Sequence, residues 1–189
     1  FVVPRSMMLF AVLLMVIHIS DIIQSRAVRE EKLKQMSEID EMTGMYNKNK
    51  YLDMTKSYYH DIDKIAVIFW DVNGLKATND TYGHKAGDSL IKNVAVSIEE
   101  SVNGSGNIFR IGGDEFIAVL DNVTEEDVKK IINNWKKCME LRNVNNELEL
   151  SASVGYSIGN GNNIERIVDD ADSRMYKQKQ KYKKTRENI

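Results

Sequence analysis

The sequence predicts an α+β domain in which one central, mainly antiparallel sheet is flanked by helices, with an N-terminal helical segment in front of it. Residues 65–70 form a continuous apolar run, which is typical of a strand buried on both faces. Two further apolar segments flank Gly112-Gly113, and this pattern favours a β-hairpin whose turn takes positive φ angles. Amphipathic helical patterns lie between these strands, so we expect one sheet covered by helices.

The first half of the domain follows from its periodicity. A helix is expected from the residues after Gly44 to about His60, and a second, amphipathic helix over residues 86–98. Residues 103–107 form a glycine-rich turn. The hairpin strands follow, at residues 107–111 and 116–120.

The second half begins with a capped helix at Thr124. Its apolar stripe includes Trp135 and Cys138, which we expect to be buried core residues. Residues 148–158 alternate like a strand, and a last helix places apolar residues from Ile164 onward against the core.

Residues 1–23 are a hydrophobic segment. Residues 7–17 are eleven uninterrupted apolar residues, whereas a membrane-spanning helix needs about 20. Three interpretations remain open: the end of a transmembrane helix, the core of a signal peptide, or a helix that packs against a partner. Basic residues directly after the segment favour the membrane, with the domain tethered at its cytoplasmic face. We expect a sensory domain to precede this chain.

Residues 24–39 are expected to form a helical linker. Apolar and basic residues recur at alternating spacings of three and four through Ile19, Ile22, Arg26, Arg29, Leu33 and Met36. This pattern is the seam of a coiled coil, weakened by its two arginines, and a solvated linker is the other interpretation. A coiled coil would bring two copies of the following domain together.

Composition restricts the function only broadly. With 42% hydrophobic and 29% charged residues, the chain can bury a core and is not a disordered chain. Its formal net charge of −2 argues against general nucleic-acid binding. The single cysteine excludes an intramolecular disulfide and fits a reducing compartment.

Acidic residues follow two of the expected strands. Asp71 comes directly after the buried run, and Asp114 and Glu115 follow the glycine pair. Because neighbouring side chains on a strand point to opposite faces, Asp114 and Glu115 are expected to have different roles. Carboxylates beside a bare glycine turn are suited to a divalent cation that holds phosphates.

These two regions together resemble a GGDEF domain, the catalytic module of diguanylate cyclases. Residues 71–88 read DVNGLKATNDTYGHKAGD and residues 110–116 read RIGGDEF, and both are close to the family pattern. The resemblance covers about residues 40–184, within an expected domain of residues 40–189. It implies the fold of nucleotidyl cyclases and polymerase palms, and the condensation of two GTP molecules into cyclic di-GMP and two pyrophosphates.

The resemblance also implies a metal site and a catalytic centre. Metal binding is assigned to the side chains of Asp71 and Asp114 and to the backbone carbonyl of Val72, with Mg²⁺ as the expected ion and Mn²⁺ as its substitute. Glu115 completes the catalytic group and would either act on the ribose 3′-hydroxyl or bind the metal. Asn73 stands where relatives more often carry aspartate, which keeps an oxygen ligand but removes a charge.

Substrate phosphates are expected near two turns. The backbone amides of Gly74 and Leu75 would bind them, with Lys76 as a point charge. Gly112 and Gly113 would let the substrate approach the backbone closely.

The remaining substrate contacts come from helices. Asn79 and Asp88 match the family's guanine-reading positions, and Asp88 favours GTP over ATP. Lys179 and Lys183 match its basic pair in the last helix, although a lysine at 183 lacks the bidentate fork of arginine and Tyr182 replaces the family's glycine.

The product has two-fold symmetry while one chain presents one site. Two chains, each with one GTP, are therefore expected to face each other as a homodimer. The expected function is a GTP-dependent diguanylate cyclase of bacterial second-messenger signalling. The alternative is a degenerate GGDEF module that binds GTP or a partner and regulates without catalysis.

Feedback inhibition by the product is not expected. Many relatives carry an Arg-x-x-Asp product site before the glycine pair, and its ends here are Asn103 and Gly106. Without the guanidinium and the carboxylate, cyclic di-GMP lacks its charged partners. Micromolar cyclic di-GMP should therefore leave the rate of a zipper-fused dimer unchanged, and strong inhibition would contradict this prediction.

Overall fold

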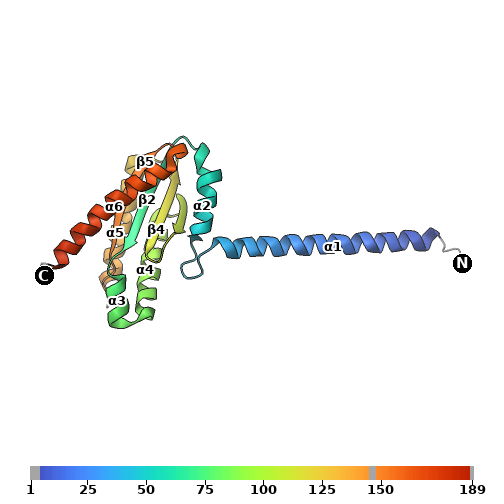
Figure 1. Ribbon diagram of the computed structural model, residues 1–189, viewed down its shortest axis with the longest axis horizontal. Helices are drawn as coiled ribbons and strands as arrows, with labels where there is room; N and C mark the ends of the chain where they lie inside the picture. Colours follow the sequence, from blue (N-terminus) through green and yellow to red (C-terminus); the bar gives the residue numbers. More distant parts are fainter. Residues whose placement is uncertain (1–4, 145–147, 188–189) are drawn as a thin grey trace. The chain divides into compact units, whose positions relative to one another are not determined.

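The structure is a computed structural model that describes residues 5–144 and 148–187. The chain divides into two compact units, Phe1–Glu38 and Ile39–Ile189. The described part of the first unit is one helix, and the second is an α+β sandwich (Figure 1). The sheet and all candidate site residues belong to the second unit.

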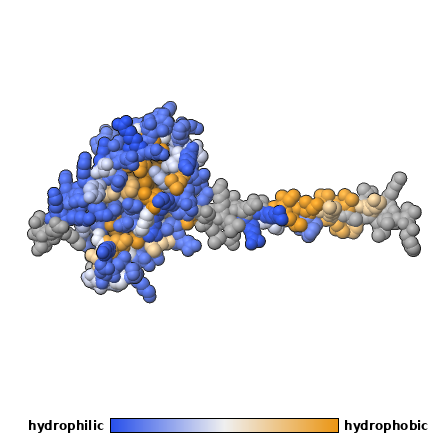
Figure 2. Space-filling view, in the orientation of Figure 1, coloured by the Kyte–Doolittle hydropathy of each residue, from blue (hydrophilic) through white to orange (hydrophobic). Residues whose placement is uncertain are grey.

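Helix α1, Arg5–Glu38, forms the first unit. The described side chains of its apolar run are exposed (Figure 2), and Phe10 for example is 63% accessible. Nowhere in the described residues is a helix long and apolar enough to cross a membrane. The end of a transmembrane helix over residues 1–23 stays a prediction. Residues 1–4 of the predicted hydrophobic segment lie outside the described part of the chain, as do the side chains of Leu33 and Met36 in the predicted seam.

Among the described residues, five strands form one mixed sheet in the order β1-β3-β4-β2-β5. The strands are β1 Tyr46–Asn47, β2 Ile65–Val72, β3 Gly106–Arg110, β4 Glu115–Asp121 and β5 Ala152–Gly159. Neighbours are antiparallel except β1 and β3, which are parallel. The predicted hairpin, β3 and β4, and the mainly antiparallel sheet are confirmed.

Helices cover both faces of this sheet (Figure 1). They are α2 Lys48–Ser57, α3 Leu75–Tyr82, α4 His84–Val102, α5 Glu125–Val144 and α6 Ile164–Glu187, with short 3₁₀ turns at Tyr59–Asp61 and Gly161–Asn163. The predicted cap of α5 is present, because the N–H of Asp127 donates to Thr124 Oγ1 at 3.2 Å and the N–H of Thr124 donates to Asp127 Oδ2 at 2.9 Å.

The sheet separates two apolar cores. On β2, Ile68 and Trp70 face α4 and α5, whereas Val67 and Phe69 face α2 and α6. Every residue of β2 is buried, as its continuous apolar run predicts. Trp135 of α5 is buried as expected and meets Trp70 edge to face, with ring centroids 6.2 Å apart. The strand that leads to Asp71 is thus fixed by packing on both sides.

Several local predictions differ from the structure. The short helix α3 and the two-residue strand β1 have no buried residue, so neither leaves an apolar period in the sequence. Strand β5 begins at Ala152 rather than at residue 148. Cys138 is half-buried rather than buried. Its thiol donates to Glu100 Oε2 of α4 at 2.8 Å.

Gly155 on β5 should tolerate no side chain. A Cβ added there would lie 2.2 Å from Ala171 O and 2.3 Å from Met175 N of α6. Because these are backbone atoms that cannot rotate away, Gly155→Ala should lower the free energy of unfolding by about 1–3 kcal/mol. Urea denaturation followed by the fluorescence of Trp70 and Trp135 measures the change.

Gly113→Ala is the matched control for this substitution. A Cβ at Gly113 meets nothing within 4 Å, and the residue does not take a positive φ angle. Equal stability of the two variants would contradict the close packing of α6 on β5.

Candidate active site

Strand alternation places two carboxylates on the same face of the sheet. Asp71 follows Val67 and Phe69 on the face of β2 that α6 covers. In the antiparallel register Asp71 lies opposite Glu115 of β4, and directly opposed residues project to the same face. Both acids therefore project toward the α6 side, where β2 ends.

Asp114 joins these two acids from the hairpin turn. Its carbonyl oxygen accepts a hydrogen bond from the N–H of Val72 at 2.9 Å, which ties the turn to the end of β2. Asp114 precedes β4, so the strand alternation expected between Asp114 and Glu115 does not apply to it. The structure thus gathers all three predicted catalytic residues.

The backbone of the glycine pair corrects the sequence prediction. Neither Gly112 nor Gly113 takes a positive φ angle, because the turn is longer than two residues and is closed by the bond from Ile111 N–H to Glu115 O at 3.0 Å. A glycine is needed at position 112 for lack of space instead, because a Cβ added there would lie 2.4 Å from Glu115 Oε2. The glycine lets the glutamate fold back over the turn.

The carboxylates perturb one another. Burial raises the pKa of Asp71 above its ordinary value; the bond from Lys179 opposes the rise, and Asp114 and Asp172 add to it. Burial likewise raises the pKa of Glu115, and the charges of Asp114 and Asp71 raise it further. Negative charge here is therefore incompletely compensated, which favours a bound cation.

The donor set suits Mg²⁺ or Mn²⁺. Magnesium is commonly held by one or two carboxylates together with substrate phosphates, rather than by a complete protein cage. The described residues contain no group of three or more His, Cys, Asp or Glu placed to hold a metal by themselves. The carboxylates of Asp71 and Asp114 fit an ion that arrives with a nucleotide, and the Val72 carbonyl would be its third protein ligand.

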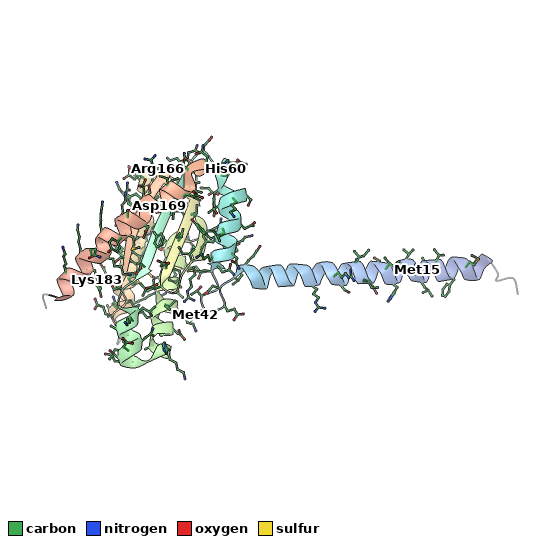
Figure 3. The ribbon with its side chains drawn as sticks, viewed as in Figure 1. Met15, Met42, His60, Arg166, Asp169 and Lys183 are labelled. Carbon is green, nitrogen blue, oxygen red and sulfur yellow. The ribbon has the colours of Figure 1, made fainter. Side chains whose placement is uncertain are left out.

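Lys179 of α6 reaches into this cluster. Its Nζ donates to Asp71 Oδ1 and forms an ion pair with it. Lys183 lies one turn farther along α6 and is exposed (Figure 3). Of the predicted basic pair, the structure therefore brings Lys179 to the carboxylates, while Lys183 extends toward solvent.

The predicted phosphate-binding turn starts α3. Gly74 takes a left-handed conformation, with φ at 74°, and Leu75 is the first helical residue. No side chain caps this helix, so its first N–H groups and its dipole are available to an anion. Lys76 is exposed beside them.

Asn73 is hydrogen-bonded to two serines, Ser151 directly before β5 and Ser153 within it. Its Nδ2 donates to Ser151 Oγ at 2.9 Å, and its Oδ1 accepts from Ser153 Oγ at 3.0 Å. Its backbone N–H donates to Ser151 O at 2.8 Å. The side-chain oxygen that the sequence offers as a metal ligand is therefore engaged in fixing the end of β2.

The predicted guanine-reading residues lie on the packed pair α3 and α4. Asn79 Oδ1 is shielded from solvent and has no hydrogen-bond partner in the described structure. It lies over Gly87, where an added Cβ would be 2.0 Å away. Asp88 follows Gly87 and is exposed. The exposed Asp88 carboxylate can accept hydrogen bonds from a ligand with paired N–H donors, whereas Asn79 Oδ1 lies against Gly87.

Comparison with known proteins shows which family has this geometry. The family model described as "Diguanylate cyclase, GGDEF domain" matches residues 37–185. The chain belongs to the GGDEF family. A crystal structure of the coiled coil and GGDEF domain of DgcB from Caulobacter crescentus in complex with c-di-GMP is similar, with a TM-score of 0.73 at 20% identity, covering 88% of this chain and 94% of that one. The palm-like fold is thereby confirmed.

Two relatives of the GGDEF domain illustrate the range of the family. Diguanylate cyclase DosC of Escherichia coli is 34% identical over 117 residues, 59% of this chain and 25% of that protein. Cyclic di-GMP phosphodiesterase PdeR of the same organism is 27% identical over 169 residues, 85% of this chain and 25% of that protein. The chain spans about a quarter of the length of both relatives.

Two features of this GGDEF domain escape the sequence patterns. Asp172 on α6 acts electrostatically on both Asp71 and Glu115, but a single exposed acid on a helix gives no signal in a sequence. Tyr182 lines a hollow of about 220 Å³ together with Gly74. The residue at the family's glycine position is therefore close to the phosphate-binding turn.

The positions of the relatives' product site have structural roles in this GGDEF domain. Asn103 ends α4 in the left-handed region, with φ at 46°. A Cβ on Gly106 would lie 2.4 Å from Val119 O of the neighbouring strand, so an aspartate there would displace backbone.

Arg110 ties the segment before β1 to the GGDEF turn. Its Nη1 donates to Asp40 Oδ1 and Oδ2 at 3.0 and 3.2 Å, and its Nη2 donates to Gly113 O at 2.8 Å. Burial by itself raises the pKa of Asp40, but hydrogen bonds from Thr43 and Arg110 outweigh it and hold the pKa below its ordinary value. Arg110 therefore holds the GGDEF turn in place through Gly113 O and Asp40.

Asp40→Asn should make the free energy of unfolding depend less steeply on pH in the acid range. A carboxylate with a lowered pKa in the folded state adds stability that is fully present above its unfolded pKa and is lost as the pH falls through the folded value. The variant should be about 1.5–3 kcal/mol less stable than the wild type at neutral pH. This difference should shrink below about pH 4.

Urea denaturation at a series of pH values tests this expectation. Asp53→Asn is the control, because Asp53 is exposed on α2 and its variant should follow the wild-type curve. An Asp40→Asn protein whose stability falls in acid as steeply as that of the wild type would contradict the prediction.

Proposed function

We propose that this GGDEF domain, residues 40–189, is a diguanylate cyclase that condenses two GTP molecules into cyclic di-GMP and two pyrophosphates. The observation that carries the proposal is the meeting of Asp71, Asp114 and Glu115 at the junction of β2 with the hairpin turn. The resemblance of both motifs to those of diguanylate cyclases supports it.

Each half-reaction is an in-line displacement. The ribose 3′-hydroxyl of one GTP attacks the α-phosphorus of the other, a new P–O bond forms, and the bond to the departing pyrophosphate breaks. Divalent cations held by Asp71, Asp114 and the Val72 carbonyl would supply charge stabilisation to the phosphoryl oxygens. Glu115, beside Asp71, either accepts the proton of the 3′-hydroxyl or assists in holding the cation.

The other residues bind and orient the substrate. The N–H groups at the start of α3, after Gly74, and the side chain of Lys76 receive the phosphates. Asn79 and Asp88 read the guanine edge, and an adenine would leave the Asp88 carboxylate without donors. Lys179 and Lys183 add positive charge from α6.

Two copies of the domain complete the reaction. Each chain has one such set of residues, and the two phosphodiester bonds of the product are equivalent, so a homodimer with one GTP per subunit suffices. The seam in residues 24–39 is the proposed means of pairing.

A regulator without catalysis is the second candidate. Asn73 and Lys183 depart from the commoner family residues, and one relative is named a cyclic di-GMP phosphodiesterase. In this case the domain would bind GTP through the same turn and helices but would not join two nucleotides.

One experiment separates the two candidates. The full chain, fused to a dimeric zipper, is incubated with GTP, ATP and Mg²⁺, and the products are resolved by chromatography. We expect cyclic di-GMP and pyrophosphate, and we expect Asp114→Asn to lower the rate by about 100-fold or more, because it removes a carboxylate proposed to hold the cation that stabilises the charge on the phosphoryl oxygens.

Asp63→Asn provides the control for that loss. Asp63 is exposed in the loop before β2, at the end of the strand opposite to Asp71, and its variant should keep the wild-type rate. GTP binding without any dinucleotide product would support the regulator instead, and products that contain adenine would contradict the role of Asp88.

A further inference from the structure

The ion pair between Lys179 and Asp71 joins α6 to the centre of the site. The lysine side chain is 22% exposed and the aspartate side chain 8%, so little water remains to solvate either charge. Asp71 is also the carboxylate to which the proposed function assigns a divalent cation. The same carboxylate is therefore the expected partner of two different positive charges.

The packing of α6 fixes the position of Lys179. Ala171 and Met175, two turns and one turn earlier on the same stripe, are buried. Gln178 Oε1 accepts a hydrogen bond from Val154 N–H of β5 at 2.5 Å. The helix is thus hydrogen-bonded to the edge strand of the sheet just before Lys179, and this bond fixes the backbone from which the lysine extends to Asp71.

We propose that Lys179 is the internal counter-ion of Asp71 in the nucleotide-free protein and keeps divalent cations off this carboxylate until GTP draws the lysine away. The inference rests on the proposed function, because it takes the phosphates of GTP as the second partner of Lys179. A buried carboxylate requires a positive partner in both states. An ammonium group on a flexible stem is suited to exchange one oxygen for another.

This exchange couples metal and nucleotide binding. When phosphate oxygens attract Lys179, Asp71 is released to the cation that accompanies the nucleotide, and by reciprocity the cation favours nucleotide binding. Without nucleotide, the ion pair compensates Asp71 and the domain remains folded without a metal. Lys179 therefore serves as a positioning residue that sets the order in which the site is filled.

Lys179→Met tests the competition directly, because it removes the charge and keeps an apolar side chain. Mn²⁺ binding to the full chain without nucleotide is measured by titration, with the free ion followed by electron paramagnetic resonance. The variant should bind Mn²⁺ about tenfold more tightly than the wild type. Lys181→Met, the same change of charge at an exposed position of α6, should bind it as the wild type does.

Removing Lys179 also leaves a buried charge without a partner, so stability is followed in parallel. Mn²⁺ should raise the unfolding temperature of Lys179→Met more than that of the wild type. Lys179→Gln, whose neutral amide can still donate to Asp71, provides a second variant if the methionine protein fails to fold.

The outcomes for the two proposals are distinguishable. Variants at Lys179 that bind Mn²⁺ no more tightly than Lys181→Met would overturn the inference, whatever the wild-type chain synthesises. Tighter Mn²⁺ binding in a chain that makes no cyclic di-GMP would leave the counter-ion role intact and remove the proposed catalysis.

Discussion

The antiparallel register of β2 against β4 is the constraint on which the site depends. It sets Asp71 opposite Glu115 and bonds Val72 to Asp114. A slip of one residue would turn Asp71 toward α4 and α5 and bury its charge in an apolar core. The register is secured by large side chains on both faces of β2, above all Trp70, so the packing of the two cores fixes the chemistry at the strand end.

Gathering carboxylates at one edge of a sheet costs electrostatic energy, and the fold offsets this cost locally. Lys179 supplies a positive charge from α6, while Arg110 fixes the turn that carries Asp114 by bonding Gly113 O and Asp40. The turn is therefore braced from the segment that leads into the domain. A movement of Asp40 would be transmitted to the turn that carries Asp114 through the side chain of Arg110.

The sequence predicts those parts that leave a periodic or spaced pattern. The buried strand, the hairpin and the amphipathic helices follow from periodicity, and the two motifs identify Asp71, Asp114 and Glu115. The partner of Lys179 does not follow, because Asp71 lies 108 positions away and spacing carries no information on such a contact. Asp172 is a single exposed acid, and α3 has no apolar period, so neither gives a signal in the sequence. The φ angles of Gly112 and Gly113 depend on the length of the turn, which the sequence leaves open.

The departures from the family pattern lie at one end of the proposed site. Asn73 is fixed between Ser151 and Ser153 beside the turn of Gly74, and Tyr182 lines the same hollow as Gly74. Asn79 and Asp88, by contrast, keep the family residues on α3 and α4. Within the proposed site, the distinctive residues therefore lie at the end assigned to the phosphates and the metal, whereas the end assigned to guanine keeps the family residues. Differences from its relatives should then concern how the triphosphate and its cation are held, rather than which base is chosen.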